Sequence, residues 1–67
     1  MNNQEWNTYF TKRRAEVTEE LDGFKRAIAK YGLRLREHDV NGERDVTDAA
    51  IRKLEEQIRE YERMLQD

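Results

Sequence analysis

Apolar residues recur along most of the chain in steps of three and four, the spacing that places them on one face of an α-helix. From residue 10 to residue 38 they form two interleaved seven-residue series: Phe10, Val17, Phe24, Tyr31 and His38, and Leu21, Ile28 and Leu35. The last third repeats the spacing with Ile51, Leu54, Ile58, Tyr61 and Leu65. Heptad spacing held over several turns is typical of helices that pack on other helices. The pattern predicts one helix over about 3–38 and a second over about 47–66.

The segment between the helices contains the turn signal Asn41-Gly42. Thr47 is expected to be the N-cap of the second helix, with Asp48 in the first turn, where a negative charge is favourable. Gly32 leaves an alternative open, because it could end the first helix and let residues 33–35 pair with a strand after the turn as a β-hairpin. The continuous helix is favoured because residues 35 and 38 keep the heptad phase and the return strand 43–46 is almost wholly charged.

These elements predict an all-α fold, an antiparallel two-helix hairpin in a single domain spanning residues 1–67 with a turn at 39–46. At 1.5 Å per residue the helices would be about 54 Å and about 29 Å long, so the second would cover only the second half of the first. One seam in so short a chain buries little core, so we expect a homodimer that forms a coiled-coil or four-helix-type bundle. The expected dimer and core residues are Phe10, Val17, Leu21, Phe24, Ile28, Tyr31, Leu35, Ile51, Leu54, Ile58, Tyr61 and Leu65.

Composition excludes several functional classes. Charged residues make up 42% of the 67-residue chain, the net charge is −2 and there is no Cys, so disulfides, thiolate metal sites and cysteine nucleophiles are ruled out. No run of 18 apolar residues is long enough to span a membrane. The start of the chain lacks the pattern of a signal peptide, so a cytoplasmic protein is expected. The helices carry acids as well as bases on their polar faces, which argues against a membrane-surface partner.

Catalytic residues are not evident. The chain has one His and neither Ser nor a glycine-rich phosphate loop. Glu37-His38-Asp39 could tune the histidine or supply half of a metal site, but a histidine near a helix end is more simply explained by the helix dipole. We expect a protein that is not an enzyme and has no metal or cofactor.

A binding role is the better expectation. Trp6, Tyr9, Arg13 and Arg14 lie close together near the start of the chain, and aromatic and Arg side chains dominate the energy of protein interfaces. We predict that these four residues bind a partner protein, on a part of the first helix that the second does not cover. Nucleic acid is the alternative partner, because the run 12–14 is basic and has aromatic neighbours. A dimerising helical hairpin would then resemble the plasmid RNA-binding regulator Rop in architecture.

The second half of the chain resembles a known group of proteins. Residues 44–51, Arg-Asp-Val-Thr-Asp-Ala-Ala-Ile, followed by Leu54, Ile58 and Tyr61, are similar to small bacteriophage proteins such as the head–tail joining proteins of the gpW type. In that family a turn containing Gly and Arg leads into a capped helix, hairpin strands precede the turn, and the first helix is usually shorter. The resemblance covers residues 42–65 and implies a phage or prophage origin. Together with the long first helix it predicts an accessory protein that binds and regulates or inhibits a host protein. A structural role in the phage particle is the alternative.

Overall fold

The computed structural model describes residues 3–65 and shows two helices joined by a β-hairpin. The elements are α1 (Asn3–Tyr31), β1 (Arg36–Asp39), β2 (Gly42–Asp45) and α2 (Thr47–Met64). The prediction of a mostly helical chain with two helices is confirmed. The prediction of an all-α chain without strands is wrong, because β1 and β2 form a small antiparallel sheet. The second helix begins at Thr47 as expected, and residue 66 of its predicted end lies outside the described residues.

Helix α1 ends at Tyr31 and does not continue to residue 38, which corrects its predicted boundary. Gly32 has a φ of 67°, a left-handed conformation that glycine adopts without the strain of a Cβ. Its N–H donates to the carbonyl of Ile28 at 3.0 Å, and the N–H of Leu33 reaches the carbonyl of Ala27 at 3.5 Å. This is the αL cap that commonly ends helices. The residues past Gly32 that keep the heptad spacing, Leu35 and His38, are therefore not helical.

The hairpin replaces the turn predicted at 39–46. Its strands pair antiparallel from Arg36 opposite Asp45 to Asp39 opposite Gly42. At the tip, Oδ1 of Asp39 accepts a hydrogen bond from the N–H of Asn41 at 2.8 Å, a local bond typical of Asp in turns. The strand residues are all exposed, and an ion pair links the facing residues Arg44 and Glu37 at 3.4 Å. An exposed two-stranded sheet is marginally stable by itself, so this one depends on how its base is held.

The base of the hairpin is closed by bonds that cross from the α1 side to the α2 side. The N–H of Val46 donates to the carbonyl of Leu35 at 2.9 Å, extending the strand pairing by one step. The N–H of Leu35 in turn donates to Oγ1 of Thr47 at 2.9 Å. Thr47 is completely buried, and its hydroxyl is the partner that satisfies the Leu35 N–H. We call the group formed by Arg34, Leu35, Asp45 and Thr47 the hairpin junction.

Asp45 supplies the capping oxygen of α2, a role that the sequence assigned to Thr47. The N-cap residue is Val46, whose side chain cannot cap, and Oδ1 of Asp45 accepts the N–H of Thr47 at 2.9 Å. Oδ2 of Asp45 accepts a bond from Nε of Arg34 at 2.8 Å. The hydrogen bonds from the Thr47 side chain, from Arg34 and from the Thr47 backbone stabilise the carboxylate and hold the pKa of Asp45 well below its usual value of 3.8.

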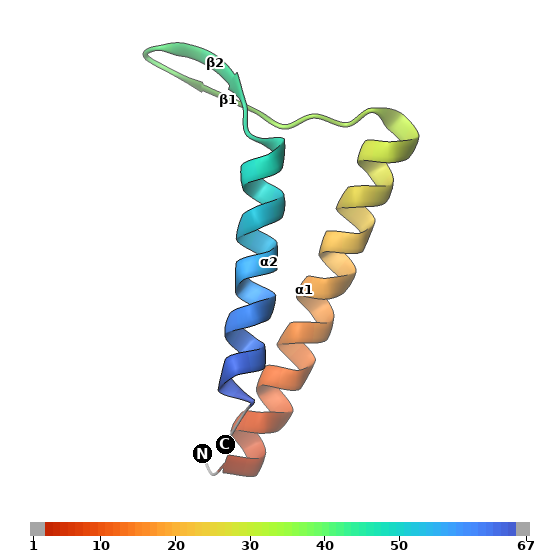
Figure 1. The fold of residues 1–67 in the computed structure, drawn as a ribbon, viewed down its shortest axis with the longest axis vertical. Coiled ribbons are helices and arrows are strands. Elements are labelled where there is room, and N and C mark those ends of the chain that lie inside the picture. The colour runs from red at the N-terminus through yellow and green to blue at the C-terminus, as the bar shows by residue number, and fades with distance from the viewer. Residues whose placement is uncertain (1–2, 66–67) are drawn as a thin grey trace.

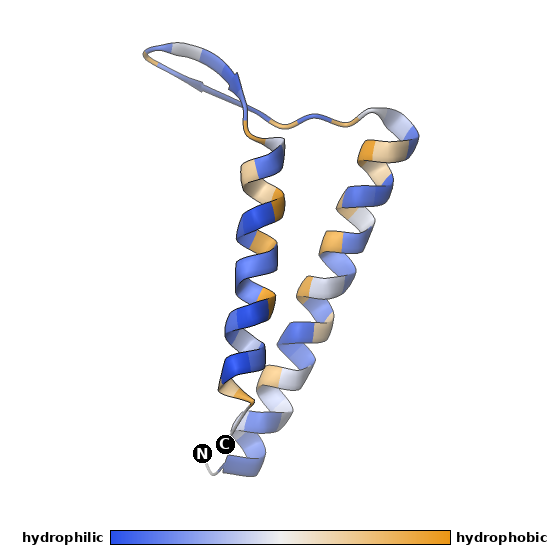
Figure 2. Cartoon of the chain, in the orientation of Figure 1, coloured by the Kyte–Doolittle hydropathy of each residue, from blue (hydrophilic) through white to orange (hydrophobic). Residues whose placement is uncertain are grey.

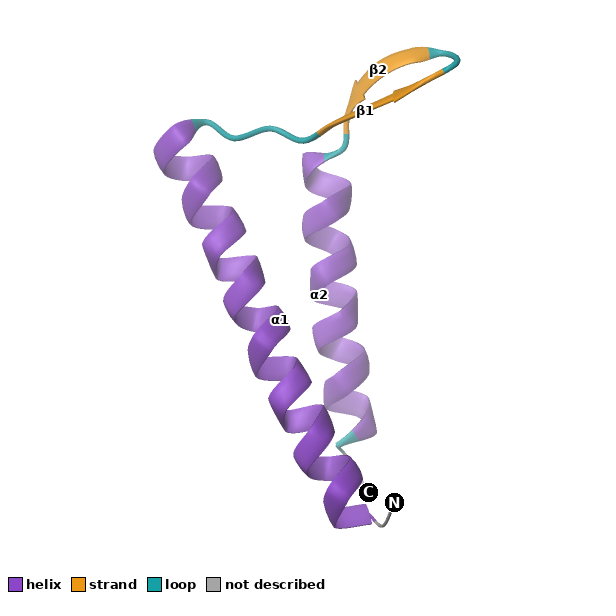
Figure 3. Cartoon of the chain, turned by 180° about the vertical axis from the view of Figure 1, so that it is seen from behind, coloured by secondary structure: helices purple, strands orange, loops and turns teal. Residues whose placement is uncertain are grey.

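The two helices run antiparallel and are closest where α1 begins and α2 ends. They diverge toward the hairpin, and the views from both sides agree on this V shape (Figures 1 and 3). Rings of Phe10 and Tyr61 lie 6.0 Å apart, and ion pairs join Arg14 to Glu62 at 3.9 Å and Lys25 to Glu55 at 3.8 Å. Contacts with α2 therefore run along α1 from Phe10 to Lys25 and include its first half. The prediction that this part would be an uncovered overhang is wrong, because α1 stops at residue 31 and the chain turns back earlier.

The apolar core lies between the helices, where their apolar positions face each other (Figure 2). Val17 and Leu21 are the buried hydrophobic residues of the described chain. Two predicted core residues lie outside this core, because Tyr31 is 74% exposed at the end of α1 and Leu35 is 39% exposed beyond it. Neither helix, over residues 3–65, is long and apolar enough to cross a membrane. The remaining predicted core residues are half-buried: Phe10, Phe24, Ile28, Ile51, Leu54, Ile58, Tyr61 and Leu65.

Two glycine substitutions should change stability in opposite directions. Gly32→Ala places a Cβ at a φ of 67° and should lower the free energy of unfolding by about 1 kcal/mol. Gly23→Ala lies inside α1, where a Cβ meets no atom within 4 Å, and should raise it by up to about 1 kcal/mol. Urea denaturation followed by circular dichroism measures both. A stabilising Gly32→Ala would show that the helix does not end at Gly32.

The hairpin junction should make stability sensitive to acid. Because the pKa of Asp45 is lower in the folded than in the unfolded chain, its contribution is complete above the unfolded value of about 3.8. It is lost as pH falls below that value toward the lowered folded pKa. Asp45→Asn should reduce stability at neutral pH and flatten the decline of the melting temperature below pH 4. Asp22→Asn, an exposed change on α1, is the control and should leave that decline unchanged. An equal slope in Asp45→Asn and the parent would contradict the assignment.

Candidate functional site

Three aromatic side chains gather at the start of α1, and we call Trp6, Tyr9 and Phe10 the aromatic cluster. The Trp6 and Phe10 rings are stacked with centroids 5.5 Å apart. Tyr9 meets both edge-on, at 6.1 Å from Trp6 and 5.4 Å from Phe10. Stacked and edge-to-face pairs at such distances are favourable arrangements for aromatic rings. The positions of these residues on successive turns of α1 therefore bring the three rings together, and each ring contacts the other two.

The cluster has an inner and an outer part. Phe10 is half-buried and contacts Tyr61 of α2, as its predicted place in the core requires. Trp6 is 44% exposed and Tyr9 is 45% exposed, so both present apolar area to solvent. Single exposed apolar side chains are ordinary on protein surfaces, whereas contiguous exposed apolar groups are the kind that mark interaction sites. Trp6 and Tyr9 are therefore the solvent-facing part of the cluster, and Phe10 is the part that packs on α2.

The two predicted partner-binding arginines are occupied by acidic neighbours. Arg13 forms an ion pair with Glu16 at 3.1 Å, and its hydrogen bonds to Tyr61 and Glu16 raise its pKa above the ordinary value. Arg14 pairs with Glu62 of α2 at 3.9 Å. Both guanidinium groups are half-exposed, and both contact α2, Arg13 through Tyr61 and Arg14 through Glu62. Their charge is offset locally, which weakens the phosphate attraction that a nucleic-acid surface needs.

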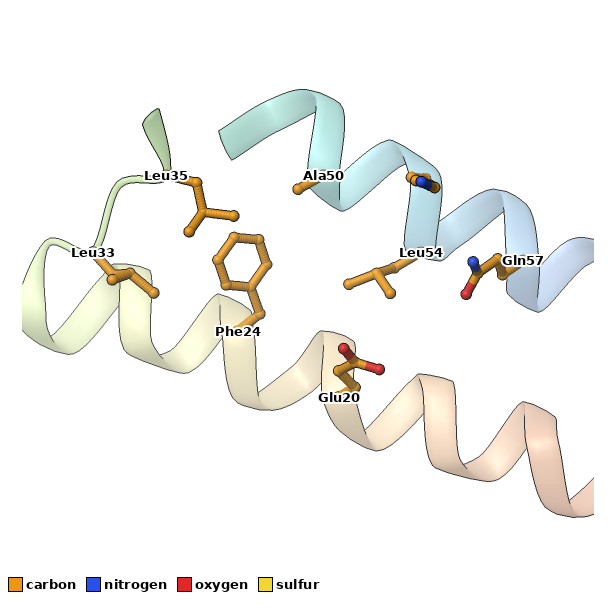
Figure 4. Close-up of a pocket in the computed structure, with 8 residues that line it drawn as sticks. Glu20, Phe24, Leu33, Leu35, Ala50, Leu54 and Gln57 are labelled. Atoms are coloured by element: carbon orange, nitrogen blue, oxygen red, sulfur yellow. The ribbon is translucent and has the colours of Figure 1, made fainter. Parts of the chain in front are cut away.

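A second surface lies at the open end of the V, where the diverging helices leave an apolar groove of about 580 Å³. Sequence reasoning missed it, because Leu33 was placed in a continuous helix. The signal was the spacing of Leu33 and Leu35, since side chains two apart in an extended segment share one side. Figure 4 shows both leucines on the same side of the chain as the ring of Phe24. The apolar lining residues are Phe24, Leu33, Leu35, Ala50 and Leu54.

The remaining candidate, the histidine between two carboxylates, does not form a metal site in the described chain. His38 lies on exposed β1, directly opposite Glu43 in the hairpin register. Neighbouring strand residues point to opposite faces of a sheet, so Glu37 and Asp39 lie on the face away from His38. Within residues 3–65, no group of three His, Asp or Glu side chains could hold a metal ion.

No protein-family model, no curated protein and no solved structure matches the chain. A functional assignment therefore has to come from the aromatic cluster and the apolar groove themselves.

Replacing each ring by alanine should distinguish the half-buried part of the aromatic cluster from its exposed part. Phe10→Ala removes a ring between the helices and should lower the free energy of unfolding by about 2–3 kcal/mol. Trp6→Ala and Tyr9→Ala remove half-exposed rings, so each should lose about 1 kcal/mol, mainly the ring contacts. Chemical denaturation measures all three, with Tyr31→Ala as the control for an exposed aromatic outside the cluster. A loss at Trp6 as large as that at Phe10 would make the cluster part of the core.

Proposed function

We propose that this protein is a non-catalytic protein-interaction module whose partner binds the aromatic cluster. The observation that carries the proposal is the exposure of Trp6 and Tyr9 on a preformed ring stack that Phe10 anchors to α2. Rings held in place before binding lose little conformational freedom in a complex, which makes them effective anchors. The flanking Arg13 and Arg14 supply donors at the edge of the same surface.

Among the roles open to such a module, a structural part of a phage particle is supported best. The sequence resembles head–tail joining proteins of the gpW type over residues 42–65, and in that family hairpin strands precede the second helix. The observed order of helix, hairpin and helix agrees with that architecture. The inhibitor role depended on a long uncovered helix, and α2 lies along the part of α1 in question. A host-protein inhibitor is therefore the second candidate.

Self-association belongs to the proposal. Val17 and Leu21 are the hydrophobic residues that the described chain buries by itself, a small core for a protein of this length. Chains this short usually gain further stability from staples or from partners, and this one has no Cys for disulfides. Association of two copies would supply apolar contacts that the single chain lacks.

Complementation in the strain that encodes the protein tests the structural role. Deleting its gene should yield phage heads and tails that are not joined, visible by electron microscopy, and the parent gene should restore joined particles. The double variant Trp6→Ala/Tyr9→Ala should fail to restore them, with at least a tenfold loss of infectious particles. Tyr31→Ala is the matched control, because it removes a more exposed aromatic outside the cluster and should complement fully.

Two results would redirect the proposal. Joined particles in the deletion strain, with the chain absent from purified particles and bound to one soluble host protein, would establish the inhibitor. Full complementation by a stably folded Trp6→Ala/Tyr9→Ala variant would show that the partner does not use the aromatic cluster.

A further inference from the structure

The apolar groove is open to solvent although five of its eight lining residues are apolar. Leu33 is 38% exposed and Leu35 is 39% exposed, and both lie beside Phe24, which is only half-buried (Figure 4). The groove runs between α1 on one side and α2 on the other, so its walls are two antiparallel helices. Two more helices laid across its mouth would complete a four-helix arrangement, the common way to bury such a seam.

The surface of the chain is large for its mass. The accessible area is 5556 Å² for 8.1 kDa, whereas compact monomers of this mass expose about 4,500 Å². The excess is about 1,000 Å², and the hairpin, whose strand residues are all exposed, contributes to it. A stable protein interface of standard size removes about 800 Å² from each partner. An interface of this size would extend beyond the groove onto the neighbouring faces of α1 and α2.

Charges at the groove match a second copy of the same surface. Glu20 lines it from α1, and Lys53 lines it from α2. Neither side chain has an ion-pair partner within residues 3–65, whereas Lys25 and Glu55 nearby pair with each other. In an interface with two-fold symmetry, a contact of residue i with residue j occurs twice. A two-fold axis along the groove would place each α1 opposite the partner's α2, and therefore each Glu20 opposite a Lys53.

We propose that the apolar groove is the dimer surface of this protein, occupied by the same groove of a second copy, with Glu20 of each chain facing Lys53 of the other. This deepens the self-association in the proposed function and does not involve the aromatic cluster. The apolar lining supplies the affinity, since it is the part removed from water. The two ion pairs select the arrangement in which α1 packs against the partner's α2, because the alternative with α1 against α1 leaves like charges opposed.

Charge reversal with mixing tests the pairing. Glu20→Lys and Lys53→Glu, each alone, turn two attractive contacts into two repulsive ones and should weaken the dimer about tenfold in sedimentation equilibrium. An equimolar mixture of the two variants should form heterodimers of parental affinity, because both cross-chain pairs are then attractive. The double variant Glu20→Lys/Lys53→Glu should dimerise like the parent for the same reason.

Leu33→Asp tests the apolar part. It places a charge in the groove and should weaken the dimer more than about 100-fold. Val40→Asp is the matched control, since Val40 is fully exposed at the hairpin tip, and it should leave the dimer intact. Circular dichroism of each variant confirms that the helices remain folded.

Each failure has a distinct meaning. A parent chain that is monomeric at all concentrations overturns self-association. A dimer that a folded Leu33→Asp variant leaves unchanged keeps self-association and overturns the groove as its surface. Charge variants that do not recover on mixing overturn the pairing of α1 with the partner's α2.

Discussion

The hydrogen bond between the Leu35 N–H and the buried hydroxyl of Thr47 is the contact on which the rest of the fold depends. It joins residues on either side of the hairpin, so it closes the loop that the exposed strands could not hold by themselves. Asp45 completes the closure by accepting hydrogen bonds from the Thr47 N–H and from Arg34. The hydrogen bond from the Thr47 side chain, followed by those from Arg34 and the Thr47 backbone, lowers the pKa of Asp45. Because Asp45 and Thr47 also form the start of α2, the base of the hairpin and the start of the second helix share the same hydrogen bonds.

This closure also determines where the helices meet. The chain leaves α1 at Gly32 and crosses to the junction in an extended conformation, so the start of α2 is held away from the end of α1 (Figure 1). The helices can then converge only at the opposite end, where Phe10 meets Tyr61. One geometric constraint therefore produces both surfaces: a tight end that displays Trp6 and Tyr9, and an open end that leaves the apolar groove. A helix continuing to residue 38 would have produced neither.

Periodicity predicted the parts of the chain that local physics decides. The helical spacing predicted the two helices and the start of α2. It also predicted that Val17 and Leu21 would be buried on the face of α1 that packs against α2. It could not give the hairpin, because the strands contain no apolar alternation and Leu35 keeps the heptad phase that favours a helix. The deciding contacts join a backbone N–H to a side chain twelve residues away, and no repeat in the sequence encodes them. Trp6 and Tyr9 could be singled out from the sequence because they are neighbours in it, whereas the groove joins residues of three separate segments.

The distribution of charge explains how so polar a chain can fix one arrangement. Exposed ion pairs contribute little stability individually, but those between α1 and α2 occur only when the helices are in this antiparallel register. Across the hairpin, Arg44 lies directly opposite Glu37 in the observed register and pairs with it, and a shift of the register by one residue would separate these two charges. The ion pairs thus specify how the two helices are aligned, while burial of the small apolar core stabilises the fold. Affinity for any partner must come from the apolar groups that this alignment leaves at the surface, and these are concentrated at the two ends of the V.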